Sequence, residues 1–222
     1  MIPRDFAKDL AALTGLLEAD GWEQIELGDG VPEASEKLAG ISFRLMTSPG
    51  RRVLFTANWR ATGSSTTFEA LDPEDPRIAR WRAAAENLPV AILAAAARAA
   101  TAPPSPGPLP LLRAAGWIKQ PPVHTASDIH ALRFQDPAAP RSATATYFSG
   151  PGRTERGPWL IERDDLAHTE DQRASAHTTP TTPGAVIAAL ALTDISPSGE
   201  HDGSALGPGP RRADTSDRST AS

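Results

Sequence analysis

The segment LLEADGW at residues 16–22 returns as LLRAAGW at residues 111–117. A second segment, PVAILAA at residues 89–95, is echoed by PGAVIAA at residues 183–189. The two intervals are about 95 and about 94 residues, and self-similarity at one period is the signature of a repeated structural unit. The sequence therefore predicts two copies of one unit, and this repeat says more about the architecture than any local motif does.

A proline-rich stretch separates the two copies. Residues 102–108 contain four prolines in seven positions, a composition typical of an extended linker. We therefore expect unit one over residues 1–101 and unit two over residues 109–194. Residues 195–222 are rich in Ser, Gly, Pro and Asp without apolar periodicity, which predicts a disordered tail. The sequence leaves open whether the two units dock into one body or remain tethered.

Each unit is predicted to begin with a helix. Apolar residues at spacings of three and four predict a helix over residues 4–20, and Gly21 follows as its C-terminal cap. The counterpart in unit two is expected at residues 109–115. Trp22 and Trp117 come directly after these helices, so we expect both side chains in the core where helix and sheet meet.

A β-hairpin is predicted next in unit one. Residues 41–46 alternate between apolar and polar side chains, which predicts a half-buried strand. A Ser-Pro-Gly turn at residues 48–50 and a second alternating run at residues 51–57 complete the hairpin. The apolar face of the first strand consists of Ile41, Phe43 and Leu45.

The remaining elements lead to an α+β fold. A third strand is expected within residues 59–71 and a closing helix over residues 89–100. The alanines of residues 77–87 favour a helix, but their counterpart in unit two has the composition of a strand, and the repeat favours a strand in both. We therefore expect two repeated units, each a small antiparallel sheet with flanking helices on one face. The expected elements of unit two are strands at residues 129–134, 142–148, 158–162 and 172–177, and a helix at residues 183–192.

Several short motifs in both units match a known family pattern. They are Gly21-Trp22, Ser48-Pro49-Gly50, Trp81-Arg82-Ala83 and Leu88-Pro89, and then Gly116-Trp117, Pro158-Trp159-Leu160-Ile161, Gln172-Arg173-Ala174 and Thr182-Pro183. Over about residues 10–193 the chain resembles tandem copies of the SPDY-motif domain of unknown function found in high-GC filamentous bacteria. It departs from that motif at Gly50, where the family has Asp, and unit two lacks the Ser-Pro turn. The resemblance implies an architecture and no established activity.

The composition excludes several classes of function. The net charge of −5 at pH 7 disfavours nucleic acid, whose partners usually carry a basic surplus. Cysteine is absent, which excludes disulfides, thiolate metal sites and cysteine nucleophiles. The first residues lack the cationic start of a signal peptide. No apolar run approaches the length that a membrane-spanning helix needs. We expect a cytoplasmic protein without a membrane partner.

The sequence carries no recognisable catalytic motif. It lacks the Gly-x-Ser-x-Gly nucleophile elbow and the Gly-Lys-Ser/Thr phosphate loop. His124, Asp128 and His130 lie close together in sequence and are the least weak candidates for a metal or catalytic group, although exposed loop histidines are the simpler interpretation. We therefore predict no catalytic residue, no metal and no cofactor.

Aromatic and basic residues gather in and beside the predicted strands of unit one. If neighbouring strands brought them to one face, they would offer stacking and cationic contacts to a protein or a nucleic acid. The simpler interpretation, to which we give more weight, places the tryptophans in the core and the arginines on the solvent face. The candidate binding residues are Arg51, Arg52, Trp59, Arg60, Arg77, Arg80, Trp81 and Arg82.

The favoured function is that of a non-enzymatic tandem module that binds another protein. This expectation rests on the duplication, on the lack of a catalytic motif and on the tail. Two alternatives stay open: a nucleic-acid-associated protein that uses the arginine and tryptophan residues, and an enzyme of unrecognised type. The sequence indicates neither the partner nor the oligomeric state.

Overall fold

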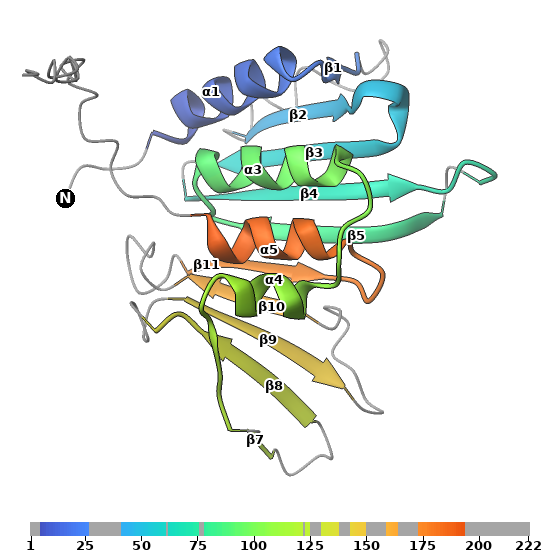
Figure 1. Cartoon of the computed structure of the whole chain (residues 1–222). Coiled ribbons are helices and arrows are strands. Elements are labelled where there is room, and N and C mark those ends of the chain that lie inside the picture. Colours follow the sequence, from blue (N-terminus) through green and yellow to red (C-terminus); the bar gives the residue numbers. More distant parts are fainter. Residues whose placement is uncertain are drawn as a thin grey trace, which may run out of the picture.

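The structure is a computed structural model of the chain (Figure 1). It describes residues 5–26, 41–60, 62–75, 78–121, 123–124, 130–137, 143–149, 159–163 and 173–193. The helices are α1 (Phe6–Ala19), α3 (Val90–Thr101), α4 (Pro108–Ala114) and α5 (Gly184–Leu192). The strands are β1 (Glu23–Gln24), β2 (Ile41–Thr47), β3 (Val53–Arg60), β4 (Gly63–Leu71), β5 (Ala79–Glu86), β6 (Ile118–Lys119), β7 (Val123–His124), β8 (His130–Gln135), β9 (Ala143–Ser149), β10 (Trp159–Arg163) and β11 (Ala174–Thr178). A short 3-10 turn, η1 (Pro49–Arg51), joins β2 to β3.

All of the described strands belong to one antiparallel sheet (Figure 1). Its order is β1-β2-β3-β4-β5-β11-β10-β9-β8-β6, and β7 pairs with β8 outside this path. The sequence predicted a small sheet in each unit. Instead, β5 and β11 pair with each other, with Ala84 opposite His177. This pairing joins the strands of the first half of the chain (β1 to β5) and those of the second half (β6 to β11) into one sheet. This pairing satisfies backbone groups that either strand would otherwise expose at an edge.

The helices of the described chain all lie on one face of this sheet (Figure 1). Helices α3 and α5 pack side by side over its centre, and α1 and α4 pack on their outer flanks. Helix α5 is apolar nearly all round, because it lies between α3, α4 and the sheet. The result is an α+β fold in which the sheet dominates.

Helix α1 follows the predicted pattern closely. The Asp5 carboxylate accepts a hydrogen bond from the Lys8 N–H at 3.1 Å and caps the start of the helix. Gly21 has a φ of 83°, the left-handed conformation that glycine tolerates best after a helix end. Toward the sheet, the Phe6 ring meets the Trp59 ring edge to face, with centroids 6.3 Å apart, one of the arrangements that aromatic pairs prefer.

The two tryptophans that follow the first helix of each half are in the core, as predicted. Trp22 is 3% exposed and Trp117 is 7% exposed. Trp22 packs edge-on against Phe55 of β3, with ring centroids 6.3 Å apart. These contacts attach the end of α1 to the sheet.

Strand β2 forms as predicted, but its apolar alternation faces away from the helices. Met46 is fully buried opposite Phe55, which places Ser42 and Arg44 on the same, helix-covered face. Phe43 and Leu45 therefore lie on the other face, where they are only half-buried. The burial of Met46 therefore decides which face of β2 points toward the helices. The alternation at residues 41–46 did not predict this, because it placed Ile41, Phe43 and Leu45 on the apolar face.

The other predicted elements agree with the structure to within a few residues. The ambiguous stretch at residues 77–87 contains strand β5, so the preference for a strand is confirmed. The strands and the closing helix expected in unit two correspond to β8, β9, β10, β11 and α5. The predicted tail at residues 195–222 lies outside the described residues. Among those that are described, no helix has the length and apolar character needed to cross a membrane.

Candidate binding face

The face of the sheet opposite the helices, called the open face below, is built by every second residue of the strands. In β3, Phe55 and Trp59 are buried on the helix side, whereas Thr56, Asn58 and Arg60 point the other way. No helix of the described chain covers this second face (Figure 1). Its residues are therefore the sheet's candidates for contact with a ligand or partner.

The predicted tryptophans and arginines lie on opposite sides of the sheet. Trp59 is 1% exposed and Trp81 is 8% exposed, and the Trp59 Nε1–H donates to Thr66 Oγ1 at 3.1 Å within the core. Arg60 and Arg82 follow them in sequence and are exposed on the open face. The tryptophans therefore offer no stacking surface beside these arginines.

Three of the six predicted arginines have acidic partners within the described chain. Arg80 pairs with Asp72 and Arg82 pairs with Glu69, each at 3.1 Å. Arg51 lies 3.9 Å from Glu23. Such pairs lower the positive charge available to a polyanion.

Two of the candidate arginines have no acidic partner within the described chain. Arg52, between η1 and β3, and Arg60, at the end of β3, form no ion pair there. Arg77 lies outside the described residues.

Polar side chains form a continuous row across the open face. Strand register places one residue from each of seven neighbouring strands on this row. In sheet order these strands are β3, β4, β5, β11, β10, β9 and β8. Within it, the Thr144 Oγ1 hydroxyl donates to Glu162 Oε2 at 3.3 Å. The row consists of Asn58, Ser65, Glu86, Ser175, Glu162, Thr144 and Gln135.

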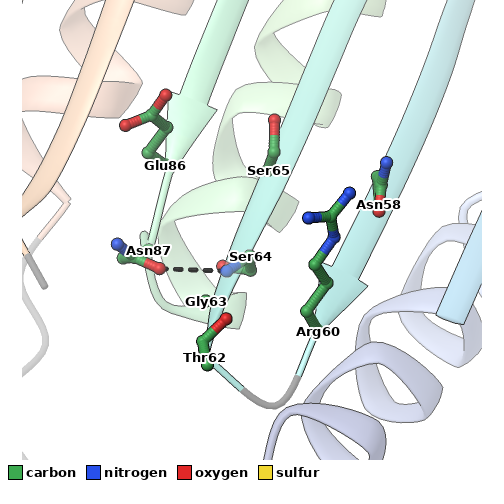
Figure 2. A pocket seen from close by; sticks show the side chains of 8 residues that line it. All are labelled: Asn58, Arg60, Thr62, Gly63, Ser64, Ser65, Glu86 and Asn87. Atoms are coloured by element: carbon green, nitrogen blue, oxygen red, sulfur yellow. Dashed lines mark hydrogen bonds between the residues drawn. The ribbon is translucent and has the colours of Figure 1, made fainter. Parts of the chain in front are cut away.

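A pocket of about 270 Å³ lies at the β3 end of the row. Figure 2 shows Arg60 on one side of Ser65 and Glu86 on the other, with Asn58 beyond the guanidinium. We call this site the Arg60–Glu86 pocket. Its lining residues are Asn58, Arg60, Thr62, Gly63, Ser64, Ser65, Glu86 and Asn87.

Asn87 fixes the frame of this pocket. Its backbone has a φ of 56°, in the left-handed region where asparagine is one of the few tolerated residues. Its side-chain Oδ1 accepts the Ser64 N–H at 2.9 Å (Figure 2). Its Nδ2 donates to the Arg173 carbonyl at 3.2 Å. The residue therefore ties the start of β4 to the residue before β11.

Sequence reasoning named Arg60 but missed the rest of the pocket. Asn87 stands immediately before Leu88-Pro89, where a chain leaves a strand and starts a helix, and a polar residue there is a turn signal. Ser65 and Glu86 carry no such signal, because only the register of β4 with β5 places them opposite each other.

One carboxyl group beside the arginines has a shifted pKa. The pKa of Asp72 is lowered, first because the Glu74 N–H donates to its carboxylate at 2.8 Å and second because Arg80 does so at 3.1 Å. Both bonds favour the charged form. They hold the turn between β4 and β5 in place.

The histidine cluster considered in the sequence is placed only in part. His124 and His130 are register partners across β7 and β8, and Asp128 lies outside the described residues. Within the described ranges, no group of three or more His, Cys, Asp or Glu residues is arranged to hold a metal ion.

An apolar area adjoins the pocket on the open face. Leu54 of β3 is half-buried there, opposite Thr47 of β2, alongside Phe43 and Leu45. Phe43 is the register partner of Asn58, so the apolar area and the polar row meet at that pair. The open face thus combines exposed charge, neutral polar groups and partly buried apolar groups.

In comparisons with known proteins, no protein-family model, no curated protein and no solved structure matches the chain.

Proposed function

We propose that the chain is a non-enzymatic tandem module that binds another protein through the open face of its sheet. The observation that carries the proposal is that one face of the sheet is covered by helices, while the other presents apolar side chains beside a polar row. Protein interfaces combine an apolar centre with a polar rim in this way. Phe43, Leu45 and Leu54 would supply the apolar centre, and the row from Asn58 onward would supply the rim.

The charge pattern favours a protein over a nucleic acid as the partner. Arg80 and Arg82 are paired with acids, and Glu86 and Glu162 lie on the same face. A polyanion would meet these carboxylates, whereas a protein surface of mixed charge can match them. Net charge points the same way.

The proposal includes the tandem architecture and the resemblance to the SPDY-motif domain. In support, α1 to α3 and α4 to α5 each begin and end with a helix around antiparallel strands, and the last strands of the two halves, β5 and β11, meet at the middle of the sheet. If the halves are copies of one unit, residues 1–101 alone should form a dimer in which two copies of β5 pair. Size-exclusion chromatography with light scattering tests this, and a folded monomer would count against duplication.

The binding proposal is tested by capture from a native lysate with the full chain as bait. Thr67→Arg places a bulky charge on the open face, between its register partners Thr56 and Ala84. Ala91→Arg makes the same kind of change at an exposed position of α3, on the helix side. We expect a discrete protein that survives a high-salt wash, bound by wild type and Ala91→Arg but not by Thr67→Arg.

Other results of this experiment would argue against the proposal. Nucleic acid recovered at low salt and lost at high salt would support the nucleic-acid alternative, because such binding depends steeply on salt. Equal capture by wild type and Thr67→Arg would remove the open face as the binding surface.

A further inference from the structure

Arg60 and Glu86 are oppositely charged residues of the open face that line the same pocket, and neither has a charged partner within the described chain. Within the described chain, neither side chain forms an ion pair or a hydrogen bond, although both line one pocket. Their neighbours behave differently, since Arg82 is paired with Glu69 and Arg80 with Asp72 on the same part of the sheet. The pocket therefore presents one free positive and one free negative group.

The strand arrangement keeps these two charges apart. Arg60 belongs to β3 and Glu86 to β5, with β4 between them. Neighbouring strands are about 4.8 Å apart, so strands β3 and β5 are separated by about 9.5 Å. Arg60 and Glu86 are also offset along the strands, because Arg60 is opposite Gly63 and Glu86 is opposite Ser65. Between them the pocket floor is low, because β4 contributes only Gly63 and the small Ser65 on this face (Figure 2).

The floor of the pocket is also rigid. A Cβ added at Gly63 would lie 3.0 Å from Asn87 Oδ1, which itself holds the Ser64 N–H. The Asn87 N–H donates in return to the Ser64 carbonyl at 2.9 Å. The groups that separate Arg60 from Glu86 are thus fixed before any ligand arrives.

The ligand that fits carries one negative and one positive group and is part of a larger molecule. A guanidinium binds a carboxylate, and a carboxylate binds an ammonium or guanidinium group, each by charge-assisted hydrogen bonds. Arg60, Ser65 and Glu86 are exposed, so the pocket cannot enclose a free small molecule as ligand sites usually do. An extended peptide can reach both groups, because residues two apart point to the same side about 6.6 Å apart.

We infer that the Arg60–Glu86 pocket recognises an extended segment of the partner protein carrying an acidic and a basic side chain two residues apart, the acid on Arg60 and the base on Glu86. This inference rests on the proposed function, and it names the chemistry of the partner at one end of the open face. Asn58 and Ser65 add neutral hydrogen-bonding groups for the peptide backbone.

The test is an NMR titration of the full, ¹⁵N-labelled chain with the peptide Ac-Gly-Asp-Gly-Lys-Gly-NH₂. We expect shifts at the amides of Ser64, Ser65 and Asn87. Replacing Asp by Asn, or Lys by Gln, in the peptide should weaken binding about two- to fivefold, the range of an exposed ion pair. A peptide with the two charges adjacent should bind no better than these neutral analogues.

Matched variants assign each charge to its partner. Arg60→Gln should abolish the preference for Asp over Asn, and Glu86→Gln should abolish the preference for Lys over Gln. Arg113→Gln and Glu18→Gln make the same charge changes at exposed positions outside the pocket and should leave both preferences intact. Because all four side chains are exposed, the variants should keep the wild-type spectrum elsewhere.

Two results would overturn the inference. One is equal binding of the dipolar and neutral peptides to wild type, and the other is a charge preference that survives Arg60→Gln and Glu86→Gln. Neither would affect the proposed function, which fails separately if Thr67→Arg captures the same partner as wild type.

Discussion

Gly184, the first residue of α5, packs directly against the carbonyl oxygen of Pro106 in the segment that joins the two halves. A side chain at this position would overlap that oxygen and would lie 2.7 Å from the Gly107 carbonyl carbon. One residue later, the Ala185 N–H donates to Ser105 Oγ at 2.9 Å and so caps the helix from a different segment. The connection between the halves is therefore fixed against the start of α5.

Gly184→Ala should destabilise the protein by about 1–3 kcal/mol, because the new methyl group overlaps backbone that cannot move independently. Gly15→Ala is the matched control, since it lies in α1 with nothing within 4 Å of the new methyl group. It should stabilise the protein by about 0.5–1 kcal/mol. Urea unfolding of both variants measures the difference, and equal stabilities would show that the close approach at Gly184 costs nothing.

The individual elements of this fold are predictable from short-range patterns. The stripe from Phe6 to Leu17 defines α1, and the alternation in β3 places Phe55 and Trp59 in the core. The joining of the strands into one sheet is not predictable in this way. It depends on the pairing of Ala84 with His177, two residues far apart in sequence in strands whose composition does not indicate a partner.

The candidate site was predictable only where a residue type is distinctive. Arg60 was named from its charge, and the favoured interpretation, with Trp59 in the core and Arg60 on the solvent face, is confirmed, because adjacent residues of a strand face opposite ways. Glu86 was not named, since a glutamate at the end of a strand is ordinary until register places it across β4 from Arg60. The geometry of this candidate site depends on strand register and not on any one sequence motif.

Asn87 provides a second prediction, which separates backbone strain from hydrogen bonding. Asn87→Ala should destabilise the protein by about 2–4 kcal/mol, because the Ser64 N–H loses its acceptor and alanine disfavours a positive φ. Asn87→Gly loses the same acceptor but tolerates the backbone, so it should be about 1 kcal/mol less damaging. Chemical denaturation of the two variants gives both values. Equal losses would mean that the φ of Asn87 carries no strain.

Arg163 provides a third prediction. This arginine of β10 is 5% exposed on the helix side, and its Nη1 donates to the carbonyls of Ala191 at 3.2 Å and Thr193 at 3.1 Å. It therefore satisfies backbone acceptors at the C-terminus of α5, where positive charge is also favoured.

Arg163→Met keeps the length of the side chain but removes its donors, and should destabilise the protein by about 1–3 kcal/mol. Amide hydrogen exchange at the end of α5 should accelerate, including at the Thr193 N–H, which bonds to the Ala189 carbonyl. Arg133→Met, at an exposed position of β8, is the control and should change neither quantity. Unchanged exchange at Thr193 in Arg163→Met would contradict the capping role.

Asp72 makes the pH dependence of the β4–β5 turn testable. Its pKa in the folded protein lies below the ordinary value of 3.8, so its charged form favours folding. The contribution is complete above the unfolded value and disappears as the pH falls through the folded one. Wild type should therefore be more stable than Asp72→Asn at neutral pH, and the advantage should begin to decrease near pH 3.8 and vanish only below the lower pKa of the folded state.

The cause of this shift can be divided between its two hydrogen bonds. Arg80→Gln removes the second cause and leaves the larger one, the Glu74 N–H, in place. The pKa of Asp72, measured from its carboxyl ¹³C shift, should therefore rise in the variant and still remain below 3.8. A return to the ordinary value would assign the shift to Arg80 alone. An unchanged pKa would mean that the ion pair at 3.1 Å between Arg80 and Asp72 does not persist in solution. Arg80 would then be available to a ligand, as the sequence-based prediction of Arg80 as a binding residue requires.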